Sequence, residues 1–440
     1  MRIQDYLGKI TWTAVDKLLF ILYGFVTIVQ IKVTNDTAAY GLFTMLTALQ
    51  TWIFIVSDGS ALQGIIQFGM DKGNRPKVNT ISGVLHISVV MGFSVLIALL
   101  HSVLATIFNE PRIAQVALWL PVYCLLTIPR SFCLKLLLRD LQMKQIFWVN
   151  FSWFGTMSGL TFWLIANGSL SNPLTSSIDK FHLLSLIAFT GMLVSSVTAV
   201  VLSRGLLGFG MRGEITFKDI ITFGLPQAGV STTHNIVRQL DGFLLLYFFH
   251  DAGAVGVYNA AKTLYRVFEQ GVDAVGGLIY PLAIRLIGEK KYDRLTTTIS
   301  KSISFLLIPS IFIVMILEAG ATDILVSLLG AKFKNSSHAF NVLIIASLFL
   351  PVTILSSVIM AFNAVKTLLQ QVCIAAIIGV STYICVGSLG RIEYYALGTV
   401  MYIVSLAVQQ FIYVSRKTGL TFPMIFRAIP DAYNYFRIRI

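Results

Sequence analysis

The chain has 440 residues, of which 56% are hydrophobic and only 12% are charged. A soluble domain carries about 25% charged residues, so this composition excludes an ordinary water-soluble protein and predicts one that is solvated by lipid. The formal net charge is +13, but the basic residues lie in short loops between apolar runs. They do not form the basic helix or aromatic–basic platform of a nucleic-acid-binding protein, so we predict no nucleic-acid partner.

Twelve apolar runs are long enough to cross a bilayer, which requires about 20 residues in a helix. We therefore predict an all-α polytopic membrane protein with twelve transmembrane helices. The first run lacks the cleavage site of a signal peptide and is interpreted as a spanning helix. The predicted spans are 9–33, 39–68, 80–107, 114–134, 145–166, 181–203, 220–249, 253–284, 302–319, 337–363, 368–388 and 393–415.

The basic residues predict the orientation of these spans. If the N-terminus is cytoplasmic, 22 Lys and Arg residues lie at cytoplasmic ends and 6 lie at outer ends. Cytoplasmic loops of membrane proteins carry an excess of Lys and Arg. We therefore expect both termini in the cytoplasm and the loop 250–252 on the outside.

The chain also contains a weak internal repeat. The segment Asp36–Gly41 (DTAAYG) aligns with Asp251–Gly256 (DAGAVG), and the same offset places Asp58 opposite Asp273. Each half then has six spans and begins on the same side, which is typical of parallel repeats in transporters. We predict two parallel six-helix bundles around a central cavity: residues 1–205, a cytoplasmic linker at 206–219, residues 220–415, and a basic cytoplasmic tail at 416–440.

The eighth predicted span carries a polar stripe. Tyr258, Lys262, Arg266, Glu269 and Asp273 lie at i, i+4, i+8, i+11 and i+15, which places them on one face of a helix. An ionisable residue inside a span costs roughly 2.5–3.5 kcal/mol on insertion scales, so each needs a partner or a function. The stripe predicts the lining of a cavity, and the alternative is that its charges form structural ion pairs.

Further polar residues mark the seventh and first spans. Gln227, Asn235 and Arg238 lie along one side of the seventh span, after Pro226, which is expected to bend the helix. Lys17 lies in the first span and is expected to point inward from the other half. We predict substrate contacts at these side chains. Apart from residues at the very ends of the spans, the remaining charged residues within them are Asp16, Asp58, Arg130 and Asp241.

The sequence offers no sign of a metal site, a cofactor or an ATP-driven motor. No H-E-x-x-H spacing and no G-x-x-x-x-G-K-[ST] motif occurs. All four cysteines fall in apolar runs without a C-x-x-C pair, so we expect buried thiols and no disulfide framework. They are Cys124, Cys133, Cys373 and Cys385.

Several phrases of the sequence are similar to a known family: AVGVYNAAKTLYRVFE (254–269), ILVSLLGAKFKNSSHAFNVLIIASLFLP (324–351) and LLRDLQMKQIFW (137–148). Together with the twelve spans they resemble the polysaccharide flippases of the multidrug/oligosaccharidyl-lipid/polysaccharide exporter superfamily. The resemblance implies a bacterial inner-membrane protein that flips an undecaprenyl-pyrophosphate-linked oligosaccharide by alternating access, as in O-antigen assembly, with other polysaccharide-assembly proteins and membrane lipids as partners.

The resemblance also implies roles for particular residues. Flippases of this kind hold the pyrophosphate and sugars with basic residues on the first, seventh and eighth helices. The matching positions here are Lys17, Arg238, Lys262 and Arg266. Acidic residues accompany these bases, which is a departure from a strongly cationic cavity and leaves the charge of the substrate open.

Two other functions compete with this interpretation. An ion-coupled exporter of drugs or small amphipathic cations would use Asp58, Glu269 or Asp273 as proton or sodium sites, and these three are our ion-coupling candidates. A membrane polysaccharide polymerase or acyltransferase would be expected to carry its catalytic residues in a large outer loop. The outer stretches 167–180 and 320–336 are short and contain no such constellation, so we do not expect an enzyme.

Overall fold

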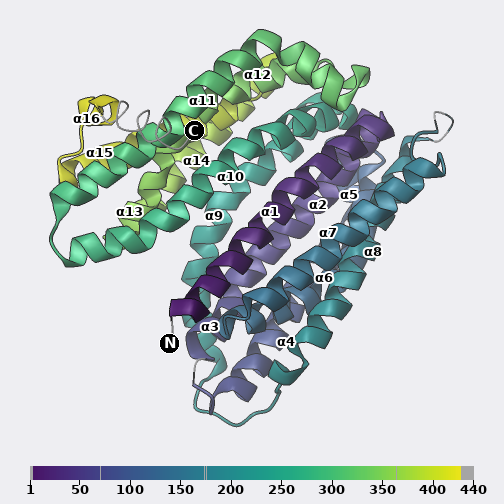
Figure 1. Ribbon diagram of the computed structural model, residues 1–440. Helices are drawn as coiled ribbons and strands as arrows, with labels where there is room; N and C mark the ends of the chain where they lie inside the picture. Colours follow the sequence, from purple (N-terminus) through teal and green to yellow (C-terminus); the bar gives the residue numbers. More distant parts are fainter. Residues whose placement is uncertain (1–2, 70, 173, 175, 363, 428–440) are drawn as a thin grey trace. The chain divides into compact units, whose positions relative to one another are not determined.

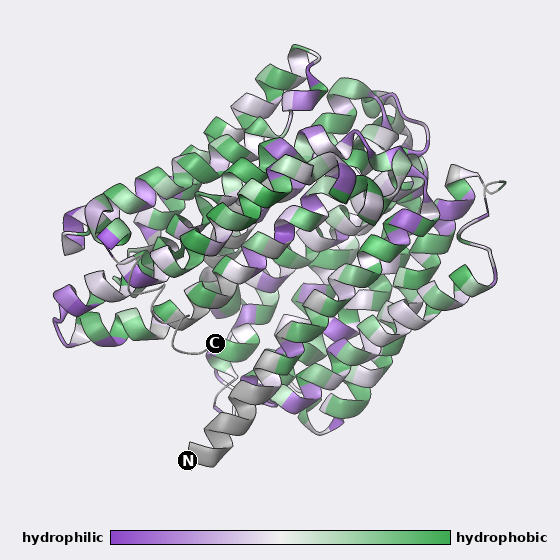
Figure 2. Ribbon diagram, turned by 45° about the horizontal axis from the view of Figure 1, so that its top comes forward, coloured by the Kyte–Doolittle hydropathy of each residue, from purple (hydrophilic) through white to green (hydrophobic). Residues whose placement is uncertain are grey.

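The computed structural model describes residues 3–69, 71–172, 174, 176–362 and 364–427; for some of these only the backbone is described. Within these ranges the chain is helical almost throughout and contains no β-strand (Figure 1). Hydrophobic residues cover much of the length of the helices, and many hydrophilic residues lie at helix ends and in connecting loops (Figure 2). This is the distribution expected for helices that cross a bilayer.

The helices that precede residue 210 are α1 (Ile3–Thr34), α2 (Thr37–Ser57), a π-helical turn (Asp58–Leu62), α3 (Gln63–Phe68), α4 (Arg75–Leu99), α5 (His101–Phe108), α6 (Ile113–Arg139), α7 (Met143–Ala166), α8 (Ser177–Ser203) and a 3₁₀ turn (Arg204–Leu206). Those that follow are α9 (Phe217–Phe249), α10 (Ala252–Gly288), α11 (Tyr292–Leu329), α12 (Ser336–Ser347), α13 (Leu355–Ala361), α14 (Val365–Ser388), α15 (Leu397–Thr418) and α16 (Phe422–Arg427), with 3₁₀ turns at Ala331–Phe333, Leu350–Ile354 and Ile392–Tyr394.

The predicted all-α polytopic fold is confirmed. If α2 is joined to α3, α4 to α5 and α12 to α13, each predicted span overlaps one long helical segment of the described chain. Seven of these helices are long and apolar enough to cross a membrane by length and composition, or eight if the pair α12 and α13, bent by 48°, is one span. α11 begins ten residues before the predicted span and ends ten after it, because hydropathy marks the apolar part of a helix and not its full length.

Contacts divide the chain into two compact units, one of Met1–Gly256 with Leu328–Lys332 and the other of Val257–Ser327 with Phe333–Ile440. α9 therefore packs with the first six predicted spans. The predicted bundles follow the sequence repeat and divide at 206–219, and that division stays a prediction.

In the first unit, loops predicted on the same side of the membrane lie together. At the predicted outer ends, the Lys180 ammonium donates to the Thr34 carbonyl at 2.9 Å, and the His250 Nδ1 lies 2.7 Å from the Phe108 carbonyl. At the predicted cytoplasmic ends, the Arg75 guanidinium contacts the Asp140 carboxylate at 2.9 Å. These contacts support the predicted alternation of the spans within this unit.

Glycines bring α2 into close contact with the start of α10, and the π-helical turn that follows α2 into close contact with α9. A Cβ added at Gly41 would overlap the carbonyl oxygen of Ala252, and one added at Gly256 would overlap that of Thr37. Further along, a Cβ at Gly59 would overlap the backbone of Ala228. Small residues allow helix backbones to approach closely in membranes, where van der Waals packing drives association. Close packing at both places therefore requires glycine.

We expect Gly41→Ala to destabilise the protein by about 1–3 kcal/mol, the usual cost of forcing atoms into a packed interface. Gly159→Ala is the matched control, because the space within 4 Å of an added Cβ at this helical glycine is open. The measurement is the thermal unfolding midpoint of each purified variant in detergent. Equal midpoints for the two variants would contradict the close contact at Gly41.

Candidate substrate-binding and ion-coupling residues

The polar stripe of α10 lies in the second unit, and the structure separates its members by burial. The side chains of Tyr258 and Lys262 are only 2% and 7% exposed. Arg266 is exposed and Glu269 is partly buried, while the side chain of Asp273 lies outside the described residues. The stripe thus combines a buried ammonium group with an accessible guanidinium group one helical turn further along.

Aromatic and hydroxyl groups surround Tyr258. Its hydroxyl lies 3.4 Å from the hydroxyl of Tyr383 on α14 and 3.2 Å from that of Thr399 on α15. The Tyr383 and Thr399 hydroxyls are 2.6 Å apart, and the ring of Tyr395 packs against both tyrosines. This cluster links three helices of the second unit and fixes the face of α10 that carries Lys262. Sequence reasoning missed Tyr383, Tyr395 and Thr399.

The Lys262 ammonium lies 5.9 Å from the centroid of the Tyr258 ring. A cation at this distance from an aromatic face is attracted by the ring quadrupole, and the attraction grows when the pair is shielded from water. The turn spacing of four residues brings the two side chains together. Tyr258 therefore helps to hold the Lys262 ammonium group inside an apolar span.

The candidates on α9 and α1 are only partly described. Asn235 is partly buried, and the side chains of Gln227, Arg238 and Lys17 lie outside the described residues. Asp241, also on α9, is 2% exposed, and its carboxylate accepts a hydrogen bond from the Gly242 amide at 2.8 Å. The predicted binding roles on these two helices stay predictions.

Asp58 lies in the π-helical turn of the first unit and pairs with Lys135 of α6. The Asp58 carboxylate is 2.8 Å from the Lys135 ammonium, and it also accepts a hydrogen bond from the Gln63 amide at 3.0 Å. The Asp58 side chain is 35% exposed and the Lys135 side chain is 17% exposed. Sequence reasoning missed Lys135, which it assigned to the cytoplasmic end of the fourth span. π-helical turns occur frequently at functional sites, and Asp58 is the first residue of this one.

A second polar network crosses the first unit around Arg130. Its guanidinium donates to the Asn150 side-chain oxygen at 2.6 Å and to the Ser195 hydroxyl at 3.0 Å, and it lies 4.5 Å from the ring centroid of Trp153. The Asn150 amide in turn donates to the Asp16 carboxylate at 2.8 Å. These contacts join α1, α6, α7 and α8, which indicates that Arg130 has a structural role.

The four cysteines differ in their exposure. All four cysteines are free thiols; Cys124 and Cys133 are buried, Cys373 is partly buried and Cys385 is exposed. The prediction of burial was correct for Cys124 and Cys133 and wrong for Cys385. Apolar composition alone does not distinguish an exposed face of α14 from a buried one. No group of three or more His, Cys, Asp or Glu side chains in the described chain is arranged to hold a metal ion.

The apolar helices define a multi-pass membrane protein, and its fold is shared with solved structures of transporters. The structure is similar to that of the lipid II flippase MurJ in an inward closed conformation, with a TM-score of 0.74 and 12% identity over 98% of this chain and 92% of the other. It is also similar to an inward-facing multidrug resistance MATE family transporter of the MOP superfamily, with a TM-score of 0.69 and 13% identity over 93% of this chain and 98% of the other.

A MOP superfamily transporter from Pyrococcus furiosus, described as having a binding pocket of reverse polarity, matches with a TM-score of 0.55 and 12% identity over 97% of this chain and 95% of the other. The model of the polysaccharide biosynthesis protein family matches residues 7–286. The chain belongs to this family, and the resemblance found in the sequence is confirmed. A search of curated protein sequences gave no match.

Proposed function

We propose that this protein is a flippase that moves an undecaprenyl-pyrophosphate-linked oligosaccharide across the bacterial inner membrane by alternating access, for surface polysaccharide assembly. One observation carries the proposal: a chain with a transporter fold belongs to the polysaccharide biosynthesis protein family. In this proposal the substrate combines a polar glycan with a lipid tail. A flippase moves the glycan through the protein while the tail stays in the bilayer.

The buried cation on α10 supports an anionic head group as the ligand. A pyrophosphate carries about two negative charges, and burying it away from water is costly unless it is paired. Lys262, Arg266, Arg238 and Lys17 supply the positive charges in this proposal, with arginine suited to two-pronged contacts and lysine acting as a point charge. Asn235 and Gln227 supply amide groups for the sugars. Tyr258, whose buried hydroxyl contacts Tyr383 and Thr399, contributes to the site by holding Lys262 in place.

Asp58, Glu269 and Asp273 are the proposed ion-coupling residues. Asp58 already has a cationic partner in Lys135, so proton or ion binding at Asp58 would compete directly with this ion pair. Such competition changes the contact between the π-helical turn and α6, which is a physical means of linking ion binding to a helix movement. The proposed role of Asp58 therefore includes Lys135.

A second candidate is an ion-coupled exporter of drugs or small amphipathic cations. The similarity to a multidrug resistance MATE family transporter favours it. Deletion of the gene in its native host distinguishes the two functions. A flippase predicts loss of surface polysaccharide and accumulation of lipid-linked oligosaccharide at the cytoplasmic face, whereas an exporter predicts retention of cationic dyes. Unchanged surface polysaccharide together with dye retention would refute the flippase proposal.

Both termini are proposed to be cytoplasmic, with the loop at Asp251 on the outside. Cysteine labelling tests this topology in a variant without the four native cysteines. A cysteine at Asp251 is expected to react with a membrane-impermeant reagent added outside, and one at Lys290 only after the membrane is opened. Both positions are exposed. Reaction of the Asp251 position from the cytoplasmic side alone would reverse the proposed orientation.

A further inference from the structure

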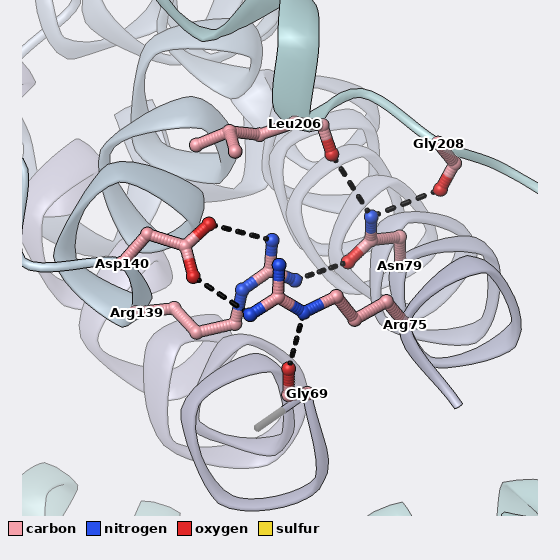
Figure 3. Close-up of polar contacts among 7 residues, drawn as sticks. All are labelled: Gly69, Arg75, Asn79, Arg139, Asp140, Leu206 and Gly208. Atoms are coloured by element: carbon pink, nitrogen blue, oxygen red, sulfur yellow. Dashed lines mark hydrogen bonds and ion pairs between the residues drawn. The ribbon is translucent and has the colours of Figure 1, made fainter. Parts of the chain in front are cut away.

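The segment that joins α8 to α9, residues 204–216, is bound along α4 and is called the connector below. The Asn79 side-chain amide donates to the carbonyls of Leu206 at 3.3 Å and Gly208 at 2.9 Å (Figure 3). The Thr80 hydroxyl donates to the Gly210 carbonyl at 3.1 Å and accepts from the Gly210 amide at 2.9 Å. The single Thr80 hydroxyl proton is shared with the Pro76 carbonyl at 2.9 Å. The two bonds from Asn79 and the bond from the Gly210 amide therefore fix the backbone of the connector between residues 206 and 210.

A buried arginine orients the Asn79 side chain. Arg139 is 4% exposed, and its guanidinium donates to the Asn79 side-chain oxygen at 3.1 Å and contacts the Asp140 carboxylate at 3.4 Å. Because arginine only donates, the Asn79 oxygen must face it, and the Asn79 amide must then face the connector. Arg75 contacts the same carboxylate, so the support beneath the connector is a connected polar network (Figure 3).

The side chains of the connector point in two directions. Leu206 and Leu207 pack against the buried cluster that includes Leu136 of α6. Phe209 and Met211 instead are 60% and 72% exposed. A backbone held through its carbonyl and amide groups would be expected to present polar side chains to water, yet this segment presents its two largest apolar ones.

Phe209 lies beside α4, about two turns after the first residue of that helix. Its ring stacks on that of Phe132 with centroids 6.0 Å apart, and it is 4.0 Å from the position of a Cβ at Gly83. Gly83 follows Arg75, the first residue of α4, by eight positions, which corresponds to about 12 Å along the helix at 1.5 Å per residue. The next residue, Val84, is 58% exposed. Phe209 therefore adjoins an apolar, exposed stretch of a membrane-spanning helix.

Basic side chains flank the two exposed apolar ones. Arg204 and Arg212 are both exposed, and so is Lys218 just beyond the connector. Glu214 is the one acidic residue of 204–216. Apolar side chains between arginines match the boundary between acyl chains and anionic head groups, where burial and charge attraction act together.

We propose that the connector is a membrane anchor, in which Phe209 and Met211 insert into the leaflet on the side of the connector and Arg204 and Arg212 bind the phosphates of anionic lipids. The hydrogen bonds from Asn79 and Thr80 hold the two apolar side chains in the inserting position. The anchor fixes the level of α4, α8 and the start of α9 in the bilayer. It goes beyond the proposed transport function and does not depend on the substrate.

Insertion is tested with spin labels on the full chain, in a variant without its four native cysteines, in vesicles of phosphatidylcholine and phosphatidylglycerol. Labels are placed singly at Phe209, Met211 and, as the matched control in the same connector, Glu214. The labels at 209 and 211 are expected to collide more with oxygen than with a water-soluble nickel complex, and the label at 214 to show the opposite. Water-type accessibility at both 209 and 211 would overturn the proposal.

Lipid selectivity is tested with a fluorophore at Met211 and brominated lipids as quenchers. Brominated phosphatidylglycerol is expected to quench more strongly than brominated phosphatidylcholine. Each arginine removed, as Arg204→Gln or Arg212→Gln, should reduce the relative affinity for the anionic lipid by roughly fivefold. Equal quenching by both lipids in the parent protein would overturn the proposed contacts between the arginines and lipid phosphates. The proposed transport function is tested separately, and it would stand if glycan transport were unchanged.

Discussion

Alanine substitution at Lys17, Arg238, Lys262 and Arg266 is expected to abolish glycan export in at least two of the four single variants while the protein still accumulates in the membrane. The physical reason is that each cation offsets part of the cost of moving a pyrophosphate away from water. Loss of one charge-assisted contact of about 1.5–3 kcal/mol reduces binding by roughly one to two orders of magnitude. Surface glycan and membrane protein level are measured together for each variant.

Lys262 requires a closer comparison because its side chain is 7% exposed. Lys262→Arg retains the charge beside Tyr258 and is expected to keep more activity than Lys262→Ala. Lys334→Ala serves as the matched control, since it removes an exposed positive charge from the loop after α11. Full activity in all four alanine variants would place the head-group site elsewhere and leave the charges of the stripe with a structural role.

We expect a large loss of stability when the ion pair between Asp58 and Lys135 is broken. Lys135→Met leaves the Asp58 carboxylate without its ammonium partner, and breaking a buried pair in this way costs about 3–5 kcal/mol. We expect a somewhat smaller loss here, because the Asp58 side chain is 35% exposed. The double variant Asp58→Asn with Lys135→Met removes both charges and should recover most of the stability. The measurement is the thermal unfolding midpoint of the purified parent protein, of Lys135→Met and of the double variant.

The same variants separate a structural ion pair from ion coupling. If Asp58 only stabilises the fold, the double variant transports normally with an unchanged pH dependence. If it couples ion movement to transport, the double variant folds but its transport no longer responds to pH or sodium. A stable Lys135→Met single variant would show that the pair contributes little. Unchanged transport in both Asp58→Asn and Asp273→Asn would refute coupling at the two matched acids.

Hydropathy and charge predicted the helices and the grouping of the loops well. A span is defined locally by its apolar length, and the sidedness of loops follows from their Lys and Arg content. The contacts of Lys180 with Thr34 and of Arg75 with Asp140 therefore fall at the expected ends of the first unit. The full length of α11 was not predicted, because a helix continues beyond the apolar core without a change in its local propensities.

The partners of the candidate residues were not predictable from spacing. Asp58 and Lys135 are separated by 77 positions, and Tyr258 and Thr399 by 141. Helical periodicity assigns residues to a face of their own helix, but it does not determine which other helix lies opposite. Tyr383 and Thr399 also lie in apolar runs, where a single hydroxyl group is common. The stripe on α10 was therefore recognised from sequence, and the aromatic cluster that supports it required the structure.

Transport by the purified protein in vesicles tests the central claim most directly. A fluorescent undecaprenyl-pyrophosphate-linked oligosaccharide is incorporated in the bilayer, and its movement is followed by the loss of signal to a membrane-impermeant quencher, with a cationic dye tested in parallel. The account predicts that the protein moves the glycan lipid, that alanine at the essential basic positions stops this movement, and that the dye is not transported. Transport of the dye with no movement of the glycan lipid would contradict it.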